Sequence, residues 1–210
     1  MPIETHWLRI SRHLTALLLL VALSPCSMAL EVRSWMSIRS QGVVLQELDM
    51  SCGAASIAMV LDRLYGQRIS EEKVLEVMET GPLAATVSEM VKAIDALGYQ
   101  GKAVALDFAT LATIKTPVIL FIRSSLSKLD IGHFVVLERV TEDGVVYRDP
   151  TFGNRVIDVS TFRSYWETRE DPRLPGLAIA ILPRDQQQRD LARQFVPLRI
   201  EPVIPLQPAF

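Results

Sequence analysis

Apolar residues recur at helical spacing in three segments of the first half of the chain. The first segment begins at Ser51 and is apolar around most of its circumference up to Tyr65-Gly66, so a central, buried helix is expected. The second opens at Ser70 with acidic residues in its first turn and ends at Gly81-Pro82, and the third covers Val87 to Leu97. The pattern therefore predicts that helices come first in the folded chain.

Runs rich in β-branched and aromatic residues follow, and turn residues separate them. They lie at residues 117–123, 132–140, 145–147 and 176–182. A short strand is also predicted at Val43-Val44-Leu45, inside an otherwise extended stretch of residues 30–48. Helices first and a mostly antiparallel sheet afterwards predict the α+β class.

Residues 1–29 have the three parts of a secretory signal peptide. Basic residues supply a positive flank, Leu14 to Leu23 are almost wholly apolar, and Ser27-Met28-Ala29 places small residues before a cleavage site. Cleavage after Ala29 is expected, and with it a periplasmic or secreted protein. Two alternatives stay open: acylation of Cys26 as in lipoproteins, and retention of the segment as a membrane anchor.

The rest of the chain is predicted to form one domain and a tail. Its length suits a single domain, expected over residues 30–183. From residue 184 the chain is first polar and then carries four prolines between residues 197 and 208, which disfavour helix and central strand. Residues 184–210 are therefore predicted as a Pro-rich extended tail, packed on the domain or used to dock a partner.

Composition and charge narrow the classes of function. Hydrophobic residues make up 49% and charged residues 22% of the 210 residues, which suits a globular protein with a sizeable core. The formal net charge of -2 gives no basis for expecting a nucleic-acid partner. The sequence contains no Gly-x-x-x-x-Gly-Lys-Ser/Thr phosphate loop, so ATP is not expected to bind either.

Removal of the predicted signal peptide leaves one cysteine and one histidine, Cys52 and His133. An internal disulfide is then impossible, and a zinc site of the usual Cys/His kind is excluded. An exported protein that keeps one unpaired cysteine needs a reason for it, and catalysis is a common one.

Cys52 lies in the first turn of the predicted buried helix. The helix dipole and the unpaired N–H groups there favour a thiolate over a thiol. Gln46, six residues earlier, can turn its amide donor toward a carbonyl oxygen held beside the Cys52 N–H, and the two donors would form an oxyanion hole. Gly53 would let another chain approach the sulfur closely.

His133 begins a predicted strand, and Asp149 follows a short predicted hairpin. If the hairpin pairs these strands, the Asp149 carboxylate can orient the imidazole, which could take the thiol proton as a general base. Each residue alone has a plainer explanation, such as a small buried cysteine, a structural histidine or an aspartate that starts a turn. Their joint arrangement with Gln46 favours a nucleophilic site.

The stretch from Gln46 to Tyr65-Gly66 resembles the cysteine motif of the bacteriocin-processing, double-glycine leader peptidases. That motif has Gln, five residues, Cys-Gly, a helix rich in Ala and Met, and a closing Tyr-Gly. The stretch from His133 to Leu137, followed by Asp149-Pro150 and Gly153, resembles the same family's His and Asp motifs. The likeness covers residues 40–170. It implies a papain-like fold with N-terminal helices packed on a sheet, and no metal or organic cofactor.

The resemblance also implies roles for four residues. Cys52 would be the nucleophile, His133 the base, Asp149 the group that orients the base, and Gln46 a donor in the oxyanion hole. The expected reaction is cleavage after Gly-Gly or a similarly small pair in a peptide. The expected partners are a polypeptide substrate and components of a secretion system.

The chain departs from most of that family, whose familiar members are cytoplasmic N-terminal domains of ABC transporters. A signal peptide makes it similar to the stand-alone periplasmic members, one of which is associated with the secretion of functional amyloid. Two further functions stay open on the same fold. One is a peptide-binding module that does not cleave, and the other is an amidase or acyltransferase that acts on cell-wall peptide.

Overall fold

The computed structural model describes residues 34–78, 85–123 and 132–195. The chain divides into two units, residues 1–33 and 34–210, and every described residue belongs to the second unit. The predicted signal peptide, the end of the second predicted helix at Gly81-Pro82 and the four prolines near the C-terminus therefore lie outside the described residues.

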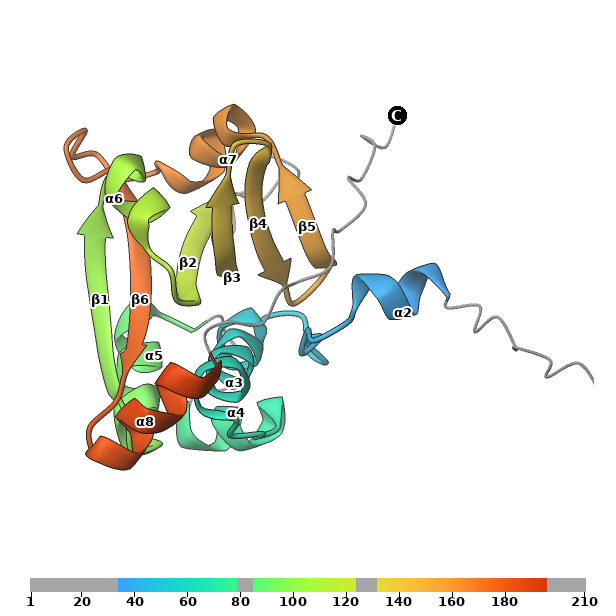
Figure 1. Ribbon diagram of the computed structural model, residues 1–210, viewed down its shortest axis with the longest axis vertical. Coiled ribbons are helices and arrows are strands. Elements are labelled where there is room, and N and C mark those ends of the chain that lie inside the picture. The colour runs from blue at the N-terminus through green and yellow to red at the C-terminus, as the bar shows by residue number, and fades with distance from the viewer. Residues whose placement is uncertain (1–33, 79–84, 124–131, 196–210) are drawn as a thin grey trace, which may run out of the picture. The chain divides into compact units, whose positions relative to one another are not determined.

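Helices and strands follow in an order that agrees with the α+β prediction (Figure 1). The helices are α2 (Trp35–Arg39), α3 (Cys52–Tyr65), α4 (Glu71–Met78), α5 (Val87–Ala96), α6 (Phe108–Thr113), α7 (Val159–Trp166) and α8 (Gln186–Phe195). The strands are β1 (Gln100–Leu106), β2 (Val118–Arg123), β3 (Gly132–Thr141), β4 (Gly144–Asp149), β5 (Gly153–Ile157) and β6 (Gly176–Leu182). All six strands form one sheet in the order β1-β6-β2-β3-β4-β5, and every neighbouring pair is antiparallel.

Both faces of this sheet are buried, because successive residues of its central strands enter two different cores. Ile119 of β2 and Phe134 of β3 pack into a core with α3, α4 and α5. Leu120 and Val135, the next residues along, pack into a second core with α7. The continuous apolar runs that predicted these strands follow from this two-sided burial.

Helix α3 is central and buried, as its apolar circumference predicted, since 12 of its 14 residues are buried. The Ser56 hydroxyl donates to the Phe134 carbonyl over 3.3 Å, and the Tyr65 hydroxyl donates to the Ile181 carbonyl over 2.8 Å. The helix is therefore attached to β3 near its beginning and to β6 at its end, which places residue 52 beside the first residues of β3.

The starts of the next two helices are capped by side chains. Ser70 accepts the Lys73 N–H over 3.2 Å before α4. Thr86 and Glu89 form a complete capping box before α5, in which each side chain accepts the other residue's backbone N–H.

Two local predictions are wrong. Residues 43–45 are not a strand, because they take part in none of the strand pairings of the sheet, and the Val43 N–H instead donates to the Ser40 carbonyl. The extended tail predicted from residue 184 begins with α8, since the Asp185 carboxylate accepts the Gln188 N–H over 2.8 Å and starts a helix before the prolines are reached. Leu191 and Ala192 of α8 pack against the core that contains α3, so this part of the segment belongs to the folded domain.

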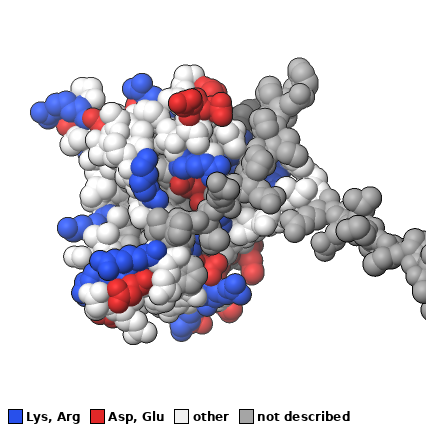
Figure 2. All heavy atoms as spheres, in the orientation of Figure 1, with Lys and Arg blue, Asp and Glu red and all other residues white. Residues whose placement is uncertain are grey.

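None of the helices in the described residues is long and apolar enough to cross a membrane. Figure 2 shows acidic and basic side chains interspersed on one face of the described residues. The described residues on that face form no broad patch of basic side chains of the kind that nucleic-acid binding needs.

Candidate active site

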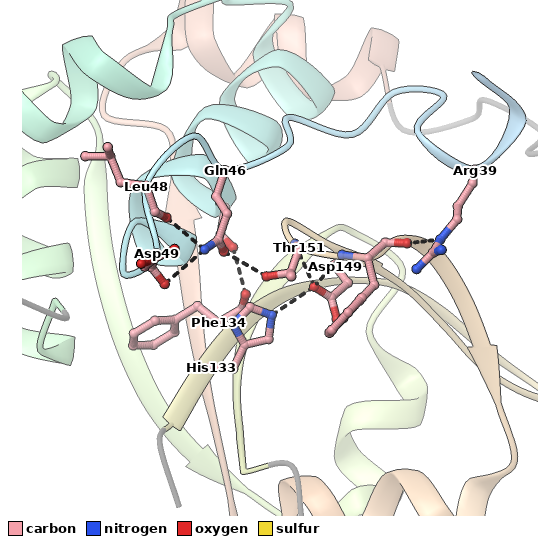
Figure 3. Close-up of polar contacts among 10 residues, drawn as sticks. Arg39, Gln46, Leu48, Asp49, His133, Phe134, Asp149 and Thr151 are labelled. Carbon is pink, nitrogen blue, oxygen red and sulfur yellow. Dashed lines mark hydrogen bonds and ion pairs between the residues drawn. The ribbon is translucent and has the colours of Figure 1, made fainter. Parts of the chain in front are cut away.

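His133 and Asp149 form a direct contact between β3 and β4. The His133 Nε2 lies 2.9 Å from the Asp149 Oδ1, as the dashed line in Figure 3 marks. Gly132 permits this position of the strand, because a Cβ there would lie 2.0 Å from the Phe121 ring on β2. The hairpin that the sequence predicted therefore does pair the two strands and brings the two side chains together.

The Asp149 carboxylate is buried and held in place by the turn that follows it. Its residue is 3% exposed. The Oδ1 atom accepts the N–H of Thr151 over 2.8 Å and that of Phe152 over 3.1 Å, in addition to the His133 contact. Three donors on one oxygen fix the carboxylate, so the imidazole that it contacts has a defined orientation.

Cys52 is the first residue of α3 and is 7% exposed. Its side chain lies close enough to His133 to raise the pKa of the imidazole. Because Nε2 is engaged by Asp149, Nδ1 is the ring nitrogen that can face the sulfur. The chain thus places sulfur, imidazole and carboxylate in series, which is the order that proton transfer from a thiol requires.

The surroundings of His133 favour its protonated form. Burial of the imidazole lowers its pKa, but the hydrogen bonds from Asp149 and Cys52 and the charges of both partners outweigh that cost and raise the pKa of His133 to about 9. The ring therefore carries two protons at neutral pH.

Gln46 lies beside these residues with its amide group engaged at both ends. Its Nε2 donates to the carbonyls of Leu48 over 2.8 Å and Asp49 over 3.1 Å, and its Oε1 accepts the Thr151 hydroxyl over 2.9 Å. Figure 3 shows Gln46 between the Leu48–Asp49 turn and Thr151. The predicted amide donor is thus present, and in this state it binds backbone carbonyls of the turn that precedes Cys52.

The four predicted residues belong to one closed series of contacts. Ser51, which precedes Cys52, donates its hydroxyl to the Leu48 carbonyl over 2.8 Å, and Gln46 donates to the same oxygen. Gln46 then contacts the Thr151 hydroxyl, and the Thr151 N–H contacts Asp149. Asp149 contacts His133, and His133 contacts Cys52. Each predicted side chain is therefore fixed by the position of the others.

Gln46 itself reaches the site because residues 39–46 lie along the β4–β5 hairpin. The Gln46 N–H donates to the Pro150 carbonyl, and the Asn154 amide donates to the Gln41 carbonyl, each over 2.9 Å. The Arg148 guanidinium donates to the Gly42 carbonyl. These contacts join a segment before α3 to a hairpin more than 100 residues later.

Arg148 is part of a buried ionic cluster that sequence reasoning missed. Its Nε lies 2.6 Å from the Glu138 Oε1, and the Arg63 Nη2 lies 3.3 Å from the Glu138 Oε2. The three side chains come from α3, β3 and β4, and Glu138 is only 4% exposed. Sequence gave no signal for the cluster, because charged residues on strands are ordinarily taken to face water.

Gly53 does not open the sulfur to a second chain in the way the sequence suggested. A Cβ at residue 53 would lie 3.2 Å from the Met90 sulfur and 3.4 Å from the Ala85 Cβ. The space that a side chain would occupy is therefore filled by this protein's own residues from α5 and the segment before it.

No metal site accompanies these residues in the part of the chain that is described. Residues 34–78, 85–123 and 132–195 contain no group of three His, Cys, Asp or Glu side chains placed to hold an ion.

The fold and the contacts above define a class of protein, that of the papain-like cysteine peptidases. Within that class, the model of the peptidase C39 family matches residues 40–169, which is more than half of the chain. The chain therefore belongs to the peptidase C39 family, and the resemblance to double-glycine leader peptidases is confirmed.

Particular relatives refine this placement. The chain is 29% identical over 159 residues to the probable functional amyloid protease FapD of Pseudomonas fluorescens. The aligned residues cover 72% of this chain and 65% of FapD. It thus spans slightly less than two thirds of that relative's length. The peptidase domain of Streptococcus ComA has a TM-score of 0.57 and 23% identity, covering 68% of this chain and 98% of that domain. A double glycine motif protease from an AMS/PCAT transporter, solved in complex with the leader peptide, has a TM-score of 0.55 and 24% identity. The match covers 67% of this chain and 90% of that structure. Both solved structures share the fold.

Proposed function

We propose that this protein is an exported cysteine peptidase that hydrolyses a peptide bond in a secreted or periplasmic polypeptide. The observation that carries the proposal is the series of contacts from Cys52 through His133 to Asp149. Membership of the peptidase C39 family supports the class of reaction. The signal-like composition of residues 1–29 supports the location.

In the proposed reaction, Cys52 attacks the carbonyl carbon of the scissile bond as a thiolate. The protonated His133, held by Asp149, gives a proton to the departing amine. Water then adds to the thioester, with His133 as the base that accepts its proton, and the free acid leaves. Each step moves one proton between His133 and the reacting groups, so no further acid or base is required.

The developing oxyanion would be stabilised by the Cys52 N–H and by Gln46. For this, one amide hydrogen of Gln46 must leave a backbone carbonyl, and the longer bond to Asp49 at 3.1 Å is the one we expect to exchange. Such donors are often misaligned in a free enzyme and tighten only when the substrate binds.

The expected cleavage site follows a pair of small residues such as Gly-Gly. The double glycine motif protease from the AMS/PCAT transporter supports this specificity by its shared fold. The likeness to the probable functional amyloid protease FapD supports a substrate among proteins secreted with, or near, an amyloid export system.

The first test is thiol reactivity of the purified protein. Iodoacetamide labelling of Cys52 at pH 6 should be at least about tenfold faster in wild type than in His133→Ala, because the imidazolium stabilises the thiolate. Ser164→Ala, which alters an exposed hydroxyl on α7, should label like wild type. Equal, slow labelling of wild type and His133→Ala would overturn the proposed Cys–His pair.

The second test is turnover. Peptides with Gly-Gly at the cleavage site should be cut by wild type and not by Cys52→Ala, whose melting temperature should stay close to that of wild type. Peptides that bind without being cut by wild type would identify a binding module instead. Release of amines from cell-wall peptide, with no cut in the Gly-Gly peptide, would identify an amidase. Cleavage by Cys52→Ala at the wild-type rate would contradict the proposal.

A further inference from the structure

Thr151 makes two contacts with the site through two different groups. Its backbone N–H donates to the Asp149 Oδ1 over 2.8 Å, and its hydroxyl donates to the Gln46 Oε1 over 2.9 Å. Figure 3 shows Thr151 between the two side chains. This one residue therefore connects the carboxylate that orients His133 to the amide proposed for the oxyanion hole.

The contact with Gln46 bears on which way the amide group faces. An amide can present either its oxygen or its NH₂ group to a neighbour, and only the NH₂ group can stabilise an oxyanion. In the free protein, the Leu48 and Asp49 carbonyls accept from Nε2 and hold it on their side. When one of these bonds is exchanged for the oxyanion, that preference weakens, whereas the Thr151 hydroxyl still holds Oε1 on the opposite side.

We propose that Thr151 is a positioning residue, whose hydroxyl holds the Gln46 amide with its NH₂ group toward the reacting carbonyl. The inference rests on the proposed role of Gln46 in the oxyanion hole. It assigns the Thr151 hydroxyl to stabilisation of the transition state and the Thr151 backbone to orientation of the triad. A side-chain substitution can therefore separate the two roles.

The decisive variant is Thr151→Val, which has nearly the same shape and keeps the backbone N–H but lacks the hydroxyl. It should lower kcat for the Gly-Gly peptide about tenfold with KM unchanged, less than the roughly 100-fold that loss of an oxyanion-hole donor costs. Its pH profile of Cys52 alkylation should match wild type, because the contact to Asp149 persists. Thr151→Ser should restore most of the activity, since it restores the hydroxyl.

Thr113→Val is the matched control. The Thr113 hydroxyl also donates to an oxygen, the Thr110 carbonyl over 2.7 Å, but it does so in α6 on a different element. This variant should keep the wild-type kcat. If it loses as much activity as Thr151→Val, the loss is a general effect of removing a hydroxyl and the inference is wrong.

A double-mutant cycle separates the inference from the function on which it rests. In a Gln46→Ala background, Thr151→Val should cause no further loss, because the group that it positions is gone. Additive losses, or full activity of Thr151→Val alone beside an impaired Gln46→Ala, would overturn the inference and leave the peptidase intact. Full activity of Gln46→Ala would overturn the oxyanion role of Gln46 and the inference together, whereas full activity of Cys52→Ala would overturn the proposed function.

Discussion

His133 experiences two opposing effects, and their balance sets its charge. Burial in a site where it is only 20% exposed opposes the protonated ring, whereas Asp149 and Cys52 favour it. The partners prevail because each offers a hydrogen bond in addition to a charge. A ring that holds its proton at neutral pH acts first as an acid toward the leaving amine.

Asp149→Asn tests this balance, because it removes the charge and keeps the shape of the side chain. The pKa of His133 should fall from about 9 toward the ordinary value of 6.5. After residue 29 the sequence contains no other histidine, so the NMR titration of one imidazole signal measures the shift directly in protein that lacks the first 29 residues. An unchanged titration midpoint would show that Asp149 contributes little.

The same raised pKa predicts how stability depends on pH. Protonation of His133 stabilises the folded state fully below pH 6.5, and this contribution is lost as the pH rises through about 9. The melting temperature of wild type should therefore decline between these values, and that of Asp149→Asn should decline less. Parallel declines in the two proteins would contradict the prediction.

Among single residues, the sequence singled out those whose side chains the structure brings together, but it did not single out Thr151, which contacts two of them. Cys52, His133, Asp149 and Gln46 could be found because their order and spacing carry a chemical pattern. Thr151 could not, because a threonine in a turn has no signature and its contact with Gln46 spans 105 residues. The actual partners of the Gln46 amide likewise depend on the turn before α3.

Among the elements, α3, β3 and β4 are joined by the cluster of Arg63, Glu138 and Arg148. Glu138→Gln leaves two largely buried guanidinium groups without their shared negative charge, so the free energy of unfolding should fall by about 3 kcal/mol. Glu142→Gln, in the exposed turn between the same two strands, should change it by less than about 0.5 kcal/mol. Chemical denaturation measures the free energy of unfolding of each variant. Equal changes in Glu138→Gln and Glu142→Gln would show that the cluster adds no stability.

Strands with two-sided burial and long helices with a buried apolar face were predictable. The short helices α6 and α7 were missed although Asp107 and Asp158 cap their first turns. Strands β2, β3 and β6 are continuous apolar runs, and their predicted bounds lie within one residue of the observed ones. Strand β1 was missed because it lies at the edge of the sheet and is mostly exposed, so its residues show no apolar pattern. Helix α8 was missed because its composition is polar and the prolines after it dominated the prediction.

For the whole molecule, processing of the N-terminus is the prediction that most affects where the protein acts. When the 210-residue chain is produced in a bacterium with a periplasm, the recovered protein should begin at Leu30, as measured by intact mass and N-terminal sequencing. Ala29→Leu should block cleavage, because signal peptidases require a small residue there. A recovered protein that begins at Met1 would favour the retained anchor, and acylated Cys26 would favour a lipoprotein.

The separation of Gln46 and Thr151 along the sequence also determines when, during synthesis of the chain, the site can form. A ribosome releases the chain from its N-terminus, so Gln46 and the helix that bears Cys52 emerge early, and Thr151 follows 105 residues after Gln46. Cys52 therefore lacks its contact with His133 until residue 133 has been made, and Gln46 lacks the hairpin that holds it until residues 148–154 have been made. On the proposed function, the newborn chain gains the ability to cut peptides only after most of its length has been made.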